Sequence, residues 1–209
     1  MTTTSATSIV FSAILFILLC VAITSEANNS GSGGAKVTDL MVEACKNASG
    51  YNEGYLFRNV TQEFCLSTLQ SDNRSVVAKD HLELVLVASD IFKGRLTTAN
   101  HNVEKMLQNA KNGTVTMRVL GFCKVYYDIT MRIINICDAM VKDFRGDKGM
   151  LNSSELPRCV DKAGYTLDEC RFEFHTAMPR ADALISENNE VRMLADLDYA
   201  LLERYDVSS

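Results

Sequence analysis

Apolar residues recur every three or four positions along most of the chain from residue 76 to residue 205. This spacing places them on one face of an α-helix, and no segment shows the sustained apolar-polar alternation of a half-exposed strand. The pattern predicts four helices. Their expected inward-facing residues are Leu82, Val85, Ala88, Phe92, Leu96, Ala99, Val103, Met106 and Ala110 in the first helix; Val115, Val119, Phe122, Tyr126, Ile129, Ile133, Ile136, Met140 and Phe144 in the second; Leu156, Val160, Ala163, Leu167, Cys170, Phe174 and Ala177 in the third; and Val191, Leu194, Leu197, Leu201 and Tyr205 in the fourth.

Residues that break or cap helices separate these segments. Asn112-Gly113 ends the first helix, and Pro179 ends the third. Asn152 with Glu155 three positions later resembles a capping box at the start of the third helix. The fourth helix follows a polar run at residues 186–189.

Two shorter helices are expected ahead of these four, at residues 38–48 and 60–70. Four helices with short connections pack most economically as an up-down-up-down bundle. The expected fold class is therefore all-α: a disulfide-stapled helical hairpin at residues 38–75 and a four-helix bundle at 76–209, together forming one domain.

The N-terminus has the pattern of a secretory signal peptide. Residues 9–23 form an apolar run of 15 that only Ser12 interrupts, short of the roughly 20 residues that cross a bilayer. Ser25 and Ala27 have the small side chains of a cleavage site. We expect cleavage after Ala27, with residues 28–37 forming a flexible N-terminus of a mature chain that has no membrane attachment. An uncleaved anchor is the alternative, because no Lys or Arg precedes the apolar run.

Asn-x-Ser/Thr triplets, the acceptors of N-glycosylation, fit a secreted protein. They begin at Asn28, Asn47, Asn59, Asn73, Asn112 and Asn152. The last five are the glycosylation candidates.

Six cysteines remain after loss of the signal peptide: Cys45, Cys65, Cys123, Cys137, Cys159 and Cys170. An even number in an oxidising compartment favours three disulfides. Facing positions in an antiparallel pair of helices have residue numbers with a nearly constant sum. Cys123 with Cys170 gives 293 and Cys137 with Cys159 gives 296, whereas the crossed pairs give 282 and 307. The register therefore predicts the first two bridges between the second and third bundle helices, and Cys45 with Cys65 closes the hairpin.

Composition and motifs favour a binding protein over an enzyme. The 209 residues are 47% hydrophobic and carry a net charge of −5 without a long basic run, so a nucleic-acid partner is not expected. No nucleophile-elbow, Walker, zinc-protease or dinucleotide-binding motif occurs, and no closely spaced Cys or His pairs suggest zinc. We therefore expect no catalytic residues, no metal and no cofactor. His81, His101 and His175 are expected at the surface, as are the carboxylates of Asp138, Asp143, Asp196 and Asp198.

Four short motifs follow one another in order within residues 38–205. They are Phe64-Cys65-Leu66-Ser67-Thr68-Leu69; Cys123 with Tyr127; Cys170 with Phe174; and Asn188 with Leu194, Ala200 and Leu201. This order resembles the plant invertase and pectin methylesterase inhibitors, in particular their pollen-allergen-like branch. The resemblance implies an inhibitor in the cell wall (apoplast) or the vacuole that docks stoichiometrically on a carbohydrate-active enzyme. It also implies the pairs Cys45–Cys65 and Cys123–Cys170, in agreement with the register.

The chain departs from the patterns of this family at several contact positions. Ile129 and Arg132 stand where pectin methylesterase inhibitors have acidic residues, for which Asp128 is a partial substitute. Glu169 and Phe172 replace a Thr and an Asp around the last cysteine. The Pro-Lys-Phe tripeptide of cell-wall invertase inhibitors is absent from residues 144–149.

The leading hypothesis is an inhibitor of pectin methylesterase or acid invertase that docks through residues 124–148 and 165–176. The candidate partner-binding residues are Lys124, Tyr127, Asp128, Arg132 and Glu169. The alternative is a secreted, ligand-binding or storage-like bundle that has kept the scaffold and lost inhibition. The sequence leaves the oligomeric state open.

Overall fold

The structure is a computed structural model that describes residues 36–50, 60–147 and 153–206. The described residues are helical and contain no strand, so the predicted all-α class is confirmed. The expected signal peptide at 1–27 lies outside them. None of the helices in the described ranges is long and apolar enough to span a membrane.

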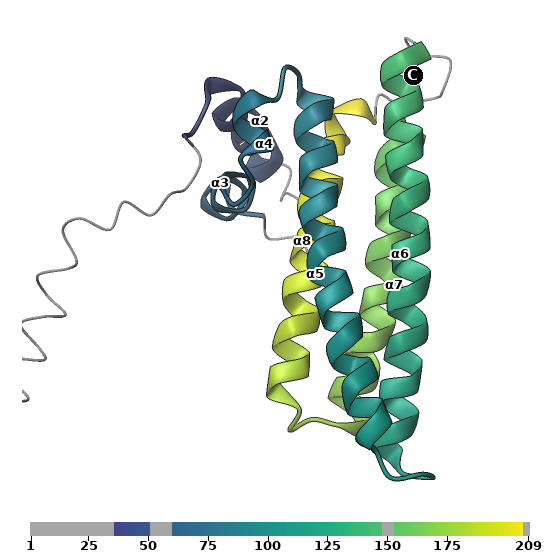
Figure 1. Ribbon diagram of the computed structural model, residues 1–209. Coiled ribbons are helices and arrows are strands. Elements are labelled where there is room, and N and C mark those ends of the chain that lie inside the picture. The colour runs from purple at the N-terminus through teal and green to yellow at the C-terminus, as the bar shows by residue number, and fades with distance from the viewer. Residues whose placement is uncertain (1–35, 51–59, 148–152, 207–209) are drawn as a thin grey trace, which may run out of the picture. The chain divides into compact units, whose positions relative to one another are not determined.

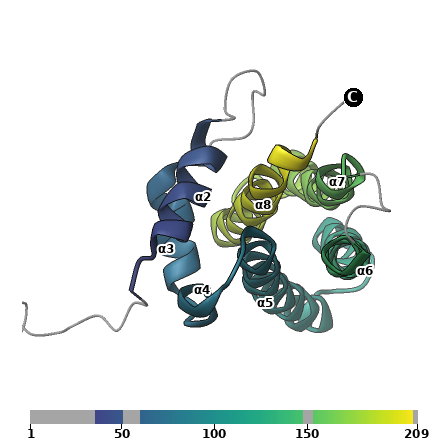
Figure 2. The same cartoon turned by 90° about the horizontal axis from the view of Figure 1, so that it is seen from above.

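Four long helices form the bundle, and shorter helices precede it (Figure 1). The bundle consists of α5 (His81–Asn109), α6 (Val115–Asp147), α7 (Glu155–Ala177) and α8 (Asp182–Leu202), and the 3-10 turn η2 (Glu203–Tyr205) follows α8. The N-terminal part contains α2 (Asp39–Gly50), α3 (Gln62–Gln70) and the single turn α4 (Arg74–Val77). Seen from above, these shorter helices lie against α5 and α8, on the side away from α6 and α7 (Figure 2).

Local capping explains where several helices begin. The side chain of Asp80 accepts a hydrogen bond of 2.9 Å from the backbone N–H of Glu83, so α5 begins at His81 and not at the expected residue 76. Gly113 has a φ of 77°, which suits glycine and turns the chain between α5 and α6. The N-cap of α7 is Ser154 and not the expected Asn152, which lies outside the described residues.

The fourth bundle helix begins earlier than its sequence pattern suggests. α8 starts at Asp182, ahead of the polar run at 186–189. Leu184 and Asn188 are buried one turn apart, so the inward face of the helix continues through this run. Polar residues on the outward face of a helix do not end it, which is why the expected start was wrong.

The three predicted disulfides are present. Cys45–Cys65 joins α2 to α3, and the Cα–Cα distance is 5.5 Å. Cys123–Cys170 and Cys137–Cys159 join α6 to α7 with Cα–Cα distances of 4.8 and 5.6 Å. The register argument therefore gives the correct alignment of the antiparallel helices α6 and α7.

The predicted inward face of α6 is correct only in part, since Val119 is buried and Tyr126, Ile133, Met140 and Phe144 pack against the core. Phe122, Ile129 and Ile136 are 45%, 38% and 58% exposed, whereas the fully buried side chains of this helix include Leu120, Tyr127 and Ile134. The exposed and the buried positions differ by one or two residues, or about 100 to 200° of rotation around the helix. The other three helices bury most of their predicted stripes.

Candidate docking surface

Large apolar side chains are exposed on the two helices that the disulfides join. Cys123, Thr130 and Cys137 of α6 contact α7. The residue before each, Phe122, Ile129 or Ile136, points about 100° away from that contact and is exposed. On α7 the residues before Cys159, Thr166 and Cys170 are likewise exposed: Arg158, Tyr165 and Glu169. We call these six residues, together with Lys162 of α7, the α6/α7 outer face.

This surface has the composition of a protein-binding site. Tyr165 is 64% exposed, and Phe172 is 65% exposed at its edge. Contiguous exposed apolar side chains rimmed by polar ones mark interaction surfaces in soluble proteins. The α6/α7 outer face is therefore the candidate docking surface.

Two of the predicted partner-binding residues lie on a different side of α6. Lys124 Nζ pairs with Asp128 Oδ2 at 3.1 Å, and Asn100 of α5 donates a 2.7 Å hydrogen bond to Asp128. Burial raises the pKa of Asp128, but the hydrogen bonds from Lys124 and Asn100 outweigh it and lower the pKa overall. Asp128 therefore joins α6 to α5, and Lys124 pairs with it within α6, whereas the predicted Arg132 and Glu169 are exposed.

Tyr127 is a packing residue and is not available to a partner, so its assignment to the docking surface is wrong. Its side chain is 1% exposed, and its hydroxyl donates a 3.0 Å hydrogen bond to Asn188 Oδ1 of α8. Asn188 in turn donates to the backbone oxygen of Leu167 at 3.3 Å. Burial raises the pKa of Tyr127 above its ordinary value. Tyr127 and Asn188 belong to two separate motifs of the sequence, and their hydrogen bond joins α6 to α8.

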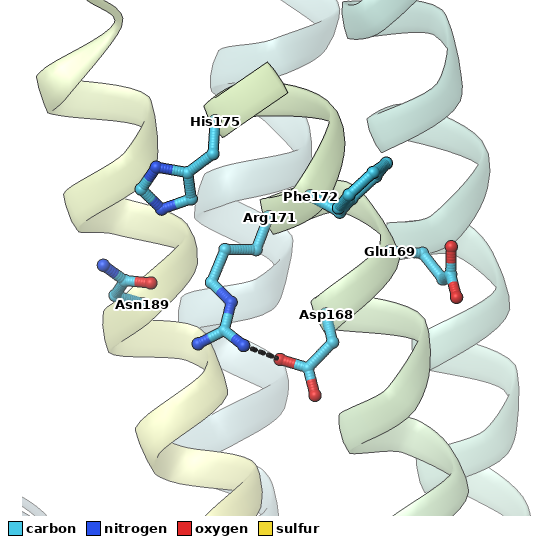
Figure 3. Close-up of a pocket in the computed structure, with 6 residues that line it drawn as sticks. All are labelled: Asp168, Glu169, Arg171, Phe172, His175 and Asn189. Atoms are coloured by element: carbon cyan, nitrogen blue, oxygen red, sulfur yellow. Dashed lines mark ion pairs between the residues drawn. The ribbon is translucent and has the colours of Figure 1, made fainter. Parts of the chain in front are cut away.

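A surface depression of about 710 Å³ lies between α7 and α8 next to the outer face (Figure 3). It is lined by Asp168, Glu169, Arg171, Phe172, His175 and Asn189. Arg171 and Asp168 point toward each other and form an ion pair of 3.0 Å. An exposed aromatic ring, a guanidinium and an amide can contact a protein loop, but no nucleophile-base pair is among these residues.

Arg192 of α8 forms two ion pairs, one of them with a residue that lines this depression. Its Nε pairs with Asp168 at 3.3 Å, and its Nη1 pairs with Asp196 of the same helix. The guanidinium lies over Gly164, where a Cβ would come within 3.1 Å of it. The glycine therefore makes room for an ion-pair bridge between α7 and α8, which fixes the position of Asp168.

Three carboxylates that were expected on the surface are buried. Asp138, Asp196 and Asp198 are 5%, 4% and 0% exposed. Each has a cation or hydroxyl partner from another helix or turn, because burying an unpaired carboxylate is costly. Lys93 pairs with Asp138 and, at 2.6 Å, with Asp90.

Asp198 is the deepest of these carboxylates. Ser89 Oγ donates a 2.8 Å hydrogen bond to Asp198 Oδ2, while Oδ1 has no hydrogen-bond partner among the described residues. Burial raises the pKa of Asp198 well above its ordinary value, against the effect of the Ser89 hydrogen bond, and the nearby Asp138 raises it further. This fully buried carboxyl group belongs to the core.

His81 is also buried, although it was expected at the surface. His81 is 8% exposed, and its Nε2 lies 2.7 Å from the backbone oxygen of Leu201, to which it donates. Burial lowers the pKa of His81, against this hydrogen bond. The start of α5 packs on the end of α8 there, which the sequence spacing alone did not indicate. His101 and His175 are exposed as expected.

The remaining predicted sites are distributed over the surface. Asn47, Asn73 and Asn112 are exposed, whereas Asn59 and Asn152 lie outside the described residues. Within the ranges that the structure describes, no cluster of three or more His, Cys, Asp or Glu side chains could hold a metal ion. No family model and no curated protein matches the chain.

Proposed function

We propose that the chain is a secreted inhibitor of a plant carbohydrate-active enzyme, either pectin methylesterase or acid invertase. The observation that carries the proposal is the disulfide-joined helix pair α6/α7, which presents Phe122, Ile136, Tyr165 and Phe172 to solvent. The choice of target class rests on the resemblance of the cysteine motifs to those inhibitors. The protein acts by binding, without catalysis, in the cell wall, with the vacuole as the second location.

A rigid surface supports stoichiometric inhibition. Two covalent bonds, Cys123–Cys170 and Cys137–Cys159, hold α6 and α7 together before any partner binds. A pre-ordered surface loses less conformational entropy on binding, so more of its contact energy becomes affinity. A ridge of two helices can bury about 800 Å² per partner, which is typical of a protease-inhibitor contact.

Charge adds to the encounter with a basic wall enzyme. The chain has a net charge of −5. Opposite net charges raise the association rate, and salt weakens this attraction. The three disulfides are typical of a protein that folds in an oxidising compartment, in agreement with secretion.

Apolar residues replace acidic ones at two contact positions, so the proposed docking would depend more on apolar contacts. Ile129 of the outer face stands where the resembling inhibitors have an acidic residue, and Phe172 stands where they have an Asp. Both side chains are exposed. The docking surface of this chain would therefore rely on Ile129, Phe172 and their apolar neighbours more than on ion pairs.

The second candidate is a secreted bundle that binds a ligand or serves as a storage protein. The substituted contact positions favour it. A small-molecule binder needs a concave apolar site. The depression beside Phe172 is open and flanked by the Asp168–Arg171 ion pair, which suits a protein loop better than an apolar ligand.

The test is a titration of the mature, oxidised protein against purified pectin methylesterase and, separately, acid invertase at pH 5 to 6 and low salt. Stoichiometric loss of one activity identifies the target. No loss of either activity, with the protein folded by circular dichroism, overturns the inhibitor proposal and favours the scaffold alternative.

Substitutions then locate the surface. Phe172→Ala should weaken inhibition at least about tenfold, because an exposed aromatic side chain offers a large apolar area for a partner to bury. The matched control is Met106→Ala, which removes a 43% exposed apolar side chain of α5 outside the proposed surface. Equal effects of the two substitutions would place the contact elsewhere.

A further inference from the structure

The second apolar stripe of α6 has the spacing of a helix-pairing seam. Phe122, Ile129 and Ile136 are exposed at intervals of seven residues. Tyr126, Ile133 and Met140 lie four residues after each, but they are half-buried and pack against the core of the bundle. An apolar residue at every seventh position recurs on one side of a helix, as in helices that pack along one another. The exposed stripe of α6 is therefore available to an additional helix.

Charged side chains of α7, exposed except for the half-buried Glu173, are segregated along the same face. Arg158 and Lys162 occupy its first half, and Glu169 and Glu173 its second half, with Tyr165 between them. Spacings of three and four residues place all five on one side of the helix. Within the described part of the chain, Lys162, Glu169 and Glu173 have no ion-pair partner, and Arg158 pairs only with Glu155 at 3.3 Å.

This distribution of charge does not stabilise α7 itself. Basic residues near the start of a helix and acidic residues near its end oppose the helix dipole. Like charges four residues apart, such as Lys162 with Arg158 or Glu169 with Glu173, also repel one another. A row that is unfavourable within its own helix indicates a partner outside it.

The two patterns share a common centre. The disulfides align α6 and α7 so that Ile129 of α6 lies level with Tyr165 of α7. The apolar stripe is symmetric about Ile129, and the charged row changes sign about Tyr165. Consider a two-fold axis that lies in this face and crosses both helices at this level. It packs α6 against α6 of the second copy, and α7 against α7 of the second copy, each pair in antiparallel orientation. It places apolar residues against apolar ones and basic residues against acidic ones.

We propose that a second copy of this chain packs on the α6/α7 outer face through this two-fold axis. Phe122 then contacts Ile136 of the second copy, and Ile129 contacts its own equivalent. Lys162 meets Glu169 of the second copy, and Arg158 meets its Glu173. Each contact occurs twice, as in every two-fold interface.

The face is accessible and large enough for such a contact. The hairpin helices pack on α5 and α8, on the opposite side of the bundle (Figure 2). Two helices side by side over about 25 residues offer on the order of 700 Å² per partner, close to the usual 800 Å² of a specific interface. Such an area fits a reversible dimer, which dissociates on dilution.

A two-fold axis along the helices would not give the same match. It would set the apolar stripe of α6 on the charged row of α7 from the second copy, and bury unpaired charges. The inference does not depend on the proposed inhibition, because the mass of the protein alone tests it.

The experiment is sedimentation velocity of the mature, oxidised chain over a wide concentration range. We expect a monomer that converts to a dimer as concentration rises. Ile129→Arg places two like charges on the axis and should weaken the dimer at least about tenfold. Met106→Arg on α5 is the matched control and should leave the dimerisation constant unchanged. Circular dichroism of both variants verifies the fold.

A charge reversal tests the register itself. Lys162→Glu or Glu169→Lys alone gives residues 162 and 169 of the two copies the same charge. Because this contact occurs twice in the dimer, either substitution should weaken it. The double substitution Lys162→Glu with Glu169→Lys restores opposite pairs and should restore most of the affinity, a rescue that a merely structural role would not produce. A chain that stays monomeric at all concentrations overturns the proposal and leaves the face for another protein. A dimer that Ile129→Arg does not weaken also overturns it, by placing the interface elsewhere.

Discussion

Charged side chains are buried and paired on the α5/α8 side of the bundle, but they are exposed on the outer side of α6 and α7. Around α5 and the inner side of α8, Asp138 and Asp198 are buried and have partners, Lys93 and Ser89, from another helix. Arg74 of α4 extends this network to the surface by pairing with Asp90 at 2.7 Å. On the outer side of α6 and α7, charges such as Lys162 and Glu169 are exposed, and two buried disulfides join the two helices behind them. The difference is what we expect if the proposed docking surface is the outer side of α6 and α7.

Removal of either disulfide between α6 and α7 should have the largest effect. Cys123→Ala with Cys170→Ala opens a loop with a sequence separation of 47. Because the Cys137–Cys159 bridge stays closed inside this loop, loop-closure entropy predicts a similar loss in the free energy of unfolding for either bridge, about 3 to 4 kcal/mol. Urea denaturation of the two double variants measures both losses. A larger loss for the shorter loop would show that packing at Cys159 outweighs the entropy.

The stability of the α5 side of the bundle should depend on the buried Lys93–Asp138 ion pair. Lys93→Met leaves Asp138 buried without its cation, and because Lys93 is partly exposed we expect a loss of about 2 kcal/mol, below the full value for a buried pair. Lys124→Met is the matched control, since the Lys124–Asp128 pair is more exposed and should contribute at most about 0.5 kcal/mol. Similar losses by urea denaturation would show that burial does not distinguish the two pairs.

Asp198 should make the stability of the core depend on pH. Burial raises the pKa of Asp198, whereas the unfolded chain has the ordinary value of about 3.9. The folded state therefore binds the proton more tightly. The stabilisation this gives is complete below pH 4 and is lost as pH rises through the raised pKa.

Asp198→Asn removes this dependence. The variant should gain stability over the native chain as pH rises above about 4, because it has no carboxylate to ionise in the core. Urea denaturation at pH 4, 5, 6 and 7 tests the trend. A stability difference that is the same at pH 4 and pH 7 would contradict it, because the effect would then come from packing alone.

The sequence predicted the parts of this molecule that depend on one helix at a time or on covalent alignment. Helical spacing gave the all-α class, and the sums of cysteine positions gave both α6–α7 bridges. The burial of Asp138 and Asp198 could not be predicted in the same way, because their partners Lys93 and Ser89 come from another helix.

The inward face of α6 was predicted only in part, although the sequence contained the signal for the rest. Periodicity identifies an apolar stripe, but it cannot choose between two stripes on one helix. The cysteines could have chosen. Cys123 and Cys137 must face α7, and they are in phase with Ile134, which is fully buried, and not with Ile129.

The smallest expected effect follows from the same contrast. Ile129→Ala should change the free energy of unfolding by less than about 0.5 kcal/mol, because an exposed side chain leaves no cavity. Ile134→Ala, one helical turn and a residue away, should lose about 2 to 5 kcal/mol, since that side chain is fully buried. Urea denaturation at a protein concentration low enough to keep the chain monomeric separates these effects from self-association. A loss for Ile129→Ala that grows with protein concentration would show that the exposed stripe stabilises the protein only by contact with a second copy.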